Sequence, residues 1–452
     1  MQGYSGGALR TLLDRAVGPY LWRPWYDQVA TPAVAKVFFP LSRAWAAALA
    51  AEGDLDRFNA SLDDGPPRRT LGAGTLRLVH SAALTHDSAR AAWDTAFFGD
   101  RRGNLAYLER ARLKAAQRLM ALRAAFLPGQ LERPFASVKF GIADEAAVSA
   151  RHAARLEAPD GLALPDLGIP IRESRRVTLD GAHWSWLRFD PPAEFRTDAP
   201  VEARVRIPGQ ELPRGTVIFA HGIGMESEFW GDRGSVTDWY LSRGYRVVEP
   251  QGPWHAYRRR PGYYGGEPIL ARGPVGLLDY SWAHLRELGR LIAWAKAFGD
   301  GPVMVAGISL GALTAMQLLS WARHWPDAAK PDVAMLIAPA ASLADVTYRG
   351  SLTGGLGVPD ALRAAGWDEG KAARWAPLLD AGEAPGIDPA RILCVLGDVD
   401  EITPIASGRD LVTRWGLREE NVFTRPQGHF SVALGLTAAP EPLVRGLALM
   451  QG

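Results

Sequence analysis

The chain has 452 residues, of which 47% are hydrophobic and 22% charged, as in an ordinary globular protein. Its 51 basic and 49 acidic residues leave a net charge of +2, and the sequence carries no DNA- or RNA-binding motif, so we expect no nucleic-acid partner. A chain of this length suits two domains or one elaborated domain.

The N-terminus has no basic segment followed by an apolar one, so we expect no secretory signal and a cytoplasmic location. Its most hydrophobic stretch, residues 33–51, is broken by Lys36, Pro40 and Arg43 and should fall short of a bilayer span. The only cysteine, Cys394, lies in an apolar run, which excludes an internal disulfide and indicates a buried core thiol.

Residues 1–170 are rich in Ala, Leu and Arg, and helical patterns outnumber strand patterns there. Helices are predicted near residues 9–17, 41–52, 87–97 and 104–127. The pattern at 106–123 is both basic and amphipathic; such a helix can lie on an anionic membrane surface or, more commonly, pack on its own protein. The sequence therefore predicts a helical N-terminal region of unknown role, with peripheral membrane contact as an open alternative.

A turn-rich passage at 159–170 is the expected linker, and beyond it strand and helix patterns alternate. Strands are predicted near 173–179, 183–189, 201–207, 215–220, 245–249, 302–306, 332–337, 391–396 and 421–425. Helices are predicted near 234–243, 278–298, 310–324, 406–415 and 441–450. Antiparallel strands followed by repeated strand–helix units favour an α/β fold with a mostly parallel sheet over residues 171–452.

The pentad at residues 307–311, Gly-Ile-Ser-Leu-Gly, joins a predicted buried strand to a predicted helix. Glycines on both sides of Ser309 permit a tight turn, and the helix N-terminus behind it favours developing negative charge. This is the arrangement of a nucleophile elbow. We therefore predict that Ser309 is the nucleophile of a serine hydrolase.

A serine hydroxyl needs a base to take its proton. His429, in Gln-Gly-His-Phe, follows the last predicted strand on a loop that Gly428 allows to turn tightly. The imidazole in turn needs a carboxylate on its other nitrogen. Asp400 is the predicted acid because it follows the strand at 391–396; Asp398 is the alternative, and Glu401 should face solvent.

The tetrahedral intermediate requires an oxyanion hole made of backbone N–H groups. Leu310 directly follows the nucleophile and is one predicted donor. The second donor should come from His-Gly-Ile-Gly after the strand at 215–220, with Ile223 preferred and Gly222 as the alternative. His221 is expected to be structural.

Aromatic residues near the predicted mouth are candidates for substrate binding: Trp230, Trp254, Tyr263 and Tyr264. The basic and aromatic loop at 255–260 could meet an anionic group of a substrate or could be a solvated surface loop. The long insertion at 341–388 is a predicted lid, in which Leu362, Trp367 and Trp375 could cover the site.

Residues from about 173 to 452 resemble the α/β-hydrolase superfamily. The resemblance rests on HGIG (221–224), GISLG (307–311), GDVD (397–400) and QGHF (427–430), in the superfamily's order. A tyrosine–glycine segment at 261–268 is similar to one in the alpha/beta hydrolase domain-containing protein 18 group. The superfamily resemblance implies the fold and a Ser–His–Asp machinery, and leaves the substrate open.

We therefore predict a carboxylic ester hydrolase acting on a small acyl ester through an acyl-enzyme. A thioesterase or acyltransferase would use the same residues, and a non-catalytic binding or membrane-associated module is the third alternative. No metal-ligand spacing or nucleotide-binding fingerprint is present, so we expect no metal and no cofactor. Oligomeric state does not follow from the sequence.

Overall fold

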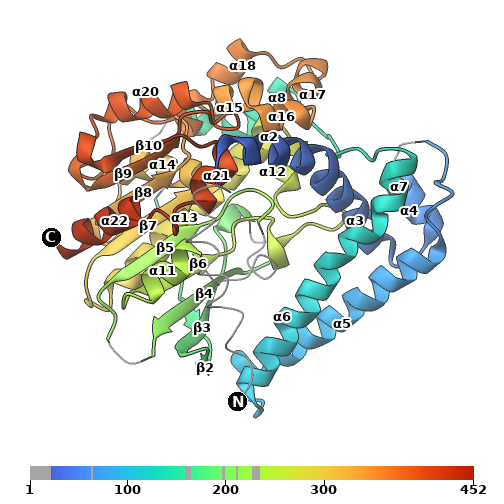
Figure 1. Ribbon diagram of the computed structural model, residues 1–452, viewed down its shortest axis with the longest axis horizontal. Coiled ribbons are helices and arrows are strands. Elements are labelled where there is room, and N and C mark those ends of the chain that lie inside the picture. The colour runs from blue at the N-terminus through green and yellow to red at the C-terminus, as the bar shows by residue number, and fades with distance from the viewer. Residues whose placement is uncertain (1–21, 63–64, 158–163, 196–198, 210–211, 226–234) are drawn as a thin grey trace.

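The computed structural model describes residues 22–62, 65–157, 164–195, 199–209, 212–225 and 235–452. The helix predicted near residues 9–17 lies outside these ranges, as does part of the expected linker. Figure 1 shows a central sheet flanked by helices, with a pair of long helices projecting to one side.

Ten strands form one sheet within the described part of the chain. They are β1 (Arg172–Glu173), β2 (Val177–Leu179), β3 (Ala182–Phe189), β4 (Val201–Pro208), β5 (Thr216–Ala220), β6 (Arg246–Pro250), β7 (Val303–Ile308), β8 (Val333–Ile337), β9 (Ile392–Gly397) and β10 (Val422–Arg425). The order is β1-β3-β4-β6-β5-β7-β8-β9-β10, with β2 paired to β3. All predicted strands are present, the first of them divided into β1 and β2.

The sheet changes character at β6. β1 to β4 pair in antiparallel fashion, and β4 meets β6 antiparallel, whereas β5 to β10 are parallel to one another. Parallel strands need crossover helices, which cover both faces and bury both. The predicted α/β fold with a mostly parallel sheet is therefore confirmed.

Alternation along the parallel strands produces two cores. On β8, Val333, Met335 and Ile337 face one core, while Ala334 and Leu336 face the other. Because side chains alternate across a strand, an uninterrupted apolar run serves both faces of the sheet at once. Cys394 on β9 lies in the larger core, where burial raises the pKa of its thiol to about 12, as expected of a core cysteine.

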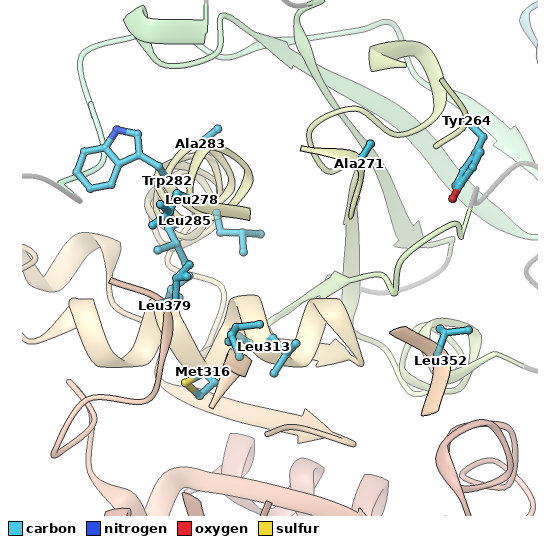
Figure 2. Packing of buried hydrophobic residues seen from close by; sticks show 14 of the residues in the cluster. Tyr264, Ala271, Leu278, Trp282, Ala283, Leu285, Leu313, Met316, Leu352 and Leu379 are labelled. Atoms are coloured by element: carbon cyan, nitrogen blue, oxygen red, sulfur yellow. The ribbon is translucent and has the colours of Figure 1, made fainter. Parts of the chain in front are cut away.

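Helices α11 (Val236–Leu241) and α22 (Glu441–Gln451) contribute to the smaller core. Helices α13 (Pro274–Lys296), α14 (Leu310–Ala322) and α20 (Ile405–Trp415) contribute to the larger one. All five were predicted, with ends displaced by a few residues. Figure 2 shows Leu313 and Met316 of α14 close to Leu379 and to α13, where the two helices pack together.

The N-terminal region is helical, as predicted. It comprises α2 (Pro24–Ala33), a π-helix (Val34–Phe38), α3 (Phe39–Ala51), α4 (Leu55–Leu62), α5 (Ala73–Phe97), α6 (Leu105–Ala121), a 3-10 helix (Leu122–Phe126), α7 (Leu127–Glu132) and α8 (Glu145–Glu157). Helices α5 and α6 form the projecting pair (Figure 1). Apolar residues of α3, including Trp45, belong to the same larger core as α13 and α14.

The apolar stretch at 33–51 is not broken by its polar residues or its proline, contrary to expectation. Helix continues from Pro24 to Ala51: a π-helix at Val34–Phe38 precedes Pro40, and the Lys36 carbonyl, which Pro40 has no N–H to bond, accepts from Gln130 Nε2 at 2.8 Å. This one helix is long and apolar enough to cross a membrane, a test that buried core helices also pass. Its C-terminal part, α3, is largely buried here, whereas α2 has no buried residue, and Arg43 of α3 donates to the carbonyls of Gly262 and Ser61.

The basic pattern at 106–123 divides between core and surface. Arg112 is fully buried, paired with Glu109 at 2.5 Å and set against the rings of Trp93 and Trp186. Arg123 is also buried, over Trp45. The exposed cations of the 106–123 pattern are Arg110, Lys114 and Arg118.

Candidate active site

The predicted elbow lies between β7 and α14. Ser309 has φ 55° and ψ −120°, a strained conformation for a residue with a side chain. A Cβ at Gly307 would lie 2.2 Å from the Gly311 carbonyl oxygen, and a Cβ at Gly311 would lie 2.1 Å from that of Ala220. Both neighbours are backbone atoms, so only glycine fits at either position. The turn presents Ser309 at the carboxyl end of β7, an interior strand of the sheet.

Three predicted side chains from three loops meet here. His429 Nε2 lies 2.8 Å from Ser309 Oγ, and His429 Nδ1 lies 2.8 Å from Asp400 Oδ2. His429 and Asp400 are almost fully buried, at 5% and 4% exposure, whereas Ser309 is half-buried. Because Asp400 accepts at Nδ1, the neutral ring keeps its lone pair on Nε2, facing the serine hydroxyl.

Asp400, not Asp398, points to the histidine. Its Oδ1 accepts from the backbone N–H groups of Ile402 and Thr403, both at 2.9 Å. Asp398 and Glu401 are exposed. The sequence reasoning missed Thr403, whose hydroxyl lies 2.8 Å from Asp400 Oδ2 and 3.2 Å from His429 Nδ1. The three contacts to Asp400 and the one from His429 Nδ1 together fix the carboxylate.

The two predicted oxyanion segments lie beside the serine. Leu310 is the first residue of α14, so its N–H has no acceptor within the helix. A Cβ on Gly222 would lie 3.5 Å from the Ser309 Cβ, and Ile223 lines the same cavity as Ser309 and Leu310. The glycine thus lets the HGIG turn approach Ser309 closely.

His221 supports this turn from behind. Its Nε2 accepts the Gly252 N–H at 3.1 Å, so Nδ1 carries the proton and donates to the Gly222 carbonyl at 2.9 Å. Burial lowers the pKa of His221 to about 4, which keeps the ring neutral. Since the Gly222 carbonyl and the Ile223 N–H belong to one peptide group, His221 orients a predicted oxyanion donor.

A cavity of about 1160 Å³, including its opening to solvent, extends from Ser309. Its wall is mainly aliphatic, from Leu277 and Leu313 on one side and Val346, Leu352, Leu356 and Leu362 on the other. The second group comes from the insertion at 341–388. Its helices are α15 (Leu343–Arg349), α16 (Ser351–Gly355), α17 (Val358–Ala364), α18 (Glu369–Ala373) and α19 (Ala376–Leu379).

Of the three residues predicted to cover the site, two line this cavity: Leu362 and Trp375. Trp367 is instead buried away from it, and its indole N–H donates to the carbonyl of Ala143 at 2.8 Å. The insertion therefore forms one wall of the cavity beside the nucleophile.

Of the predicted substrate-binding aromatics, the three that the structure describes do not line this cavity. Trp254 packs behind Leu310, at 1% exposure. Tyr264 is equally buried; its hydroxyl donates to the Ser137 carbonyl and its backbone N–H donates to the Glu267 carboxylate. Tyr263 is half-buried and packs on the larger core. Trp230 lies outside the described residues.

The basic loop at 255–260 is neither an anion site nor a solvated loop in its main part. His255 and Arg258 are buried, and Arg258 makes two bonds to Glu287, at 2.7 and 2.9 Å. A buried guanidinium already paired with a carboxylate has no charge to offer a ligand. In the described ranges, no three His, Cys, Asp or Glu side chains gather to hold a metal ion.

Several solved structures are similar to this chain. An acetyl xylan esterase from Paenibacillus sp. R4 is 14% identical, with 69% of this chain and 96% of that chain covered and a TM-score of 0.45. Acetyl xylan esterase 1 from Thermoanaerobacterium sp. JW/SL YS485 is 14% identical, with 67% and 95% covered and a TM-score of 0.42. A cold-adapted esterase from an Arctic intertidal metagenomic library is 13% identical, with 60% and 97% covered and a TM-score of 0.39.

No curated protein matches the chain, and the narrower resemblance to the alpha/beta hydrolase domain-containing protein 18 group stays a prediction. A family model described as the alpha/beta hydrolase family matches residues 217–442, half of the chain, from β5 to the start of α22. The match spans the HGIG turn, the elbow and the loops that carry Asp400 and His429. This chain belongs to the alpha/beta hydrolase family.

Proposed function

We propose that this protein is a serine hydrolase that cleaves carboxylic esters with an apolar acyl group. One observation carries the proposal: His429 bridges Ser309 and Asp400 at 2.8 Å on each side, where an aliphatic cavity opens. A serine with a strained backbone, a hydrogen-bonded imidazole and a buried carboxylate together supply an activated nucleophile.

In the first step, Ser309 Oγ attacks the acyl carbon while His429 Nε2 removes the hydroxyl proton. Asp400 stabilises the imidazolium that results, and the N–H groups of Leu310 and Ile223 hold the oxyanion. Loss of one such donor typically costs about 100- to 1000-fold in rate. The intermediate collapses as the ester oxygen leaves with the proton from Nε2, which leaves the acyl group on Ser309.

Water then repeats the sequence. His429 Nε2 takes a proton from water, whose oxygen attacks the acyl carbon, and the second intermediate expels Ser309 Oγ, which recovers its proton from the imidazolium. The acid product departs and the site is restored. Protons and electron pairs balance within the three side chains and water, so no cofactor is needed for this route.

The cavity favours an uncharged aliphatic acyl chain. Each methylene that moves from water into such a wall contributes about 0.8 kcal/mol, and a charged chain would lose its hydration there. Ala372 and Ala373 are neighbours on α18, but only Ala372 lines the cavity, whereas Ala373 is exposed.

The same residues would cleave a thioester, or would transfer the acyl group if an alcohol replaced water. Competition between water and added alcohols separates hydrolysis from transfer. A non-catalytic module is disfavoured because Ser309 and His429 are already within hydrogen-bond distance.

The test combines a fluorophosphonate probe with p-nitrophenyl esters of increasing acyl length, applied to wild type and Ser309→Ala. We expect labelling and turnover in wild type and neither in the variant. Ala372→Leu should lower turnover of the longest ester about tenfold, as for two excluded methylenes, while the matched Ala373→Leu should not. A folded wild type that resists the probe and cleaves no ester would refute the proposal.

A further inference from the structure

The helix that carries the histidine is held by a residue from the other end of the chain. Helix α21 (His429–Leu434) begins at His429 itself, and the residue at its N-cap, Gly428, has no side chain with which to cap it. Helix α2 of the N-terminal region lies beside α21 (Figure 1). From α2, Asp27 extends its carboxylate to the first turn of α21.

Asp27 takes the place of the missing cap. Its Oδ1 accepts the Phe430 N–H at 2.6 Å, and both oxygens lie 3.3 Å from the Ser431 backbone nitrogen. The Ser431 hydroxyl donates to Oδ2 and accepts the Gly428 N–H at 2.9 Å. One carboxylate therefore satisfies the orphan amides that immediately follow the histidine, a role that a side chain at the N-cap normally has.

The sequence on both sides of the contact fits this arrangement. A Cβ on Gly428 would lie 2.5 Å from the Asp27 Cγ, so the glycine leaves room for the carboxylate. Gln427 Nε2 donates to the Trp22 carbonyl at 2.8 Å. Residues 427, 430 and 431 are thus tied to residues 22 and 27, and His429 lies between them.

We propose that Asp27 is a positioning residue for His429. The inference rests on the proposed function, because it assumes that His429 is the general base. Asp27 fixes the backbone from which the imidazole reaches Ser309 and Asp400, both at 2.8 Å. The N-terminal region is thereby a part of the catalytic apparatus, although it contributes no group that touches the substrate.

The experiment compares Asp27→Ala and Asp27→Asn with wild type in full-length protein. Asp27→Ala should lower kcat about 10- to 100-fold with KM unchanged, the cost of a displaced base, and should slow fluorophosphonate labelling by the same factor. Asp27→Asn keeps an amide-accepting oxygen at the cap and should recover most of that loss.

Asp54 offers a matched control, because its carboxylate also accepts a backbone N–H, that of Arg57 at 2.9 Å, beside α4 and in the same N-terminal region. Asp54→Ala should leave kcat and labelling at wild-type values. If folded Asp27→Ala retains full kcat and labelling, or if Asp27→Asn fails as completely as Asp27→Ala, the positioning role is overturned.

A readout that needs no turnover separates this proposal from the proposed function. The proton on His429 Nδ1, bonded to Asp400, should give a far-downfield NMR resonance that disappears in His429→Ala. We expect Asp27→Ala to shift or broaden this resonance and Asp54→Ala to leave it in place. An unchanged resonance in Asp27→Ala would overturn the positioning role even if wild type proved to cleave no ester.

Discussion

The elbow at residues 307–311 and the histidine loop at 427–431 carry Ser309 and His429, the two reacting groups of the proposed mechanism, yet they are built differently. The elbow is fixed by the strand before it, the helix after it and two glycines, at which neighbouring backbone atoms leave no room for a Cβ. The histidine loop is fixed by Asp27, more than 400 residues away in sequence. The pentad therefore predicts how the elbow is held, whereas no local pattern predicts that Asp27 holds the histidine loop.

The largest expected effect comes from Asp400→Asn, which leaves the elbow intact and breaks only the histidine side. An amide in place of the carboxylate favours the wrong tautomer of His429, so kcat should fall about 10,000-fold. Asp398→Asn, on the same turn but exposed, is the matched control and should stay near wild type in the p-nitrophenyl ester assay. Similar losses in both variants would contradict the assignment of the acid.

Gly311→Ala tests the elbow. Its Cβ would lie 2.1 Å from the Ala220 carbonyl oxygen, and neither β5 nor the elbow can yield without moving Ser309. We expect a fall in kcat/KM of about 100- to 1000-fold. Gly74→Ala, with open space around its Cβ, should leave kcat/KM unchanged. Retention of wild-type activity by Gly311→Ala would mean that the elbow is not rigid.

The free energy of unfolding should depend on pH through His221, the buried histidine that supports the HGIG turn. His221 is neutral in the folded protein because burial lowers its pKa from 6.5 to about 4. The unfolded chain binds this proton first, so the stabilisation is complete above pH 6.5 and is lost as pH falls towards 4, by about 3 kcal/mol. Denaturant unfolding measures the free energy of unfolding of wild type and His221→Gln across this pH range. Plotted against pH, the two free energies should converge at low pH. A constant difference between them would contradict the role of His221.

The smallest expected effect on rate is that of Gly428→Ala. Its Cβ would meet the Asp27 carboxylate, at 2.5 Å from Cγ, but a side chain can move aside where the backbone at Gly311 cannot. We expect kcat to fall about tenfold, equivalent to about 1.4 kcal/mol in the barrier. The ratio of the Gly311→Ala and Gly428→Ala losses, measured with one ester, quantifies how differently the two elements are held.

The sequence predicted what depends on neighbours in the chain. Short apolar runs identified the parallel strands, and the turn after β9 identified Asp400 over Asp398 and Glu401 as the acid facing His429. The helix from Pro24 to Phe38 was missed because Pro24 and Pro32 are residues that normally interrupt a helix. Thr403 was missed because no local pattern shows that a threonine three residues after Asp400 turns its hydroxyl to that carboxylate.

The cavity wall next to Ser309 was only partly predicted, for a related reason. Trp254 and Tyr264 are residue types common in binding surfaces, but both are buried in the core. There the hydroxyl and the N–H of Tyr264 find hydrogen-bond partners. The actual wall is spread over short insertion helices whose apolar residues look like any core. Only the tertiary fold determines which aliphatic side chains face Ser309.

The contact between Asp27 and Phe430 also bears on how the site comes into being during folding. The two residues are separated by 403 positions, so the loop that their contact closes is among the longest in the molecule. Contacts of such separation form slowly, after local helices and neighbouring strands have paired. Refolding chains should therefore form their sheet before they react with the fluorophosphonate probe. The time at which labelling appears would then report when α2 packs against α21.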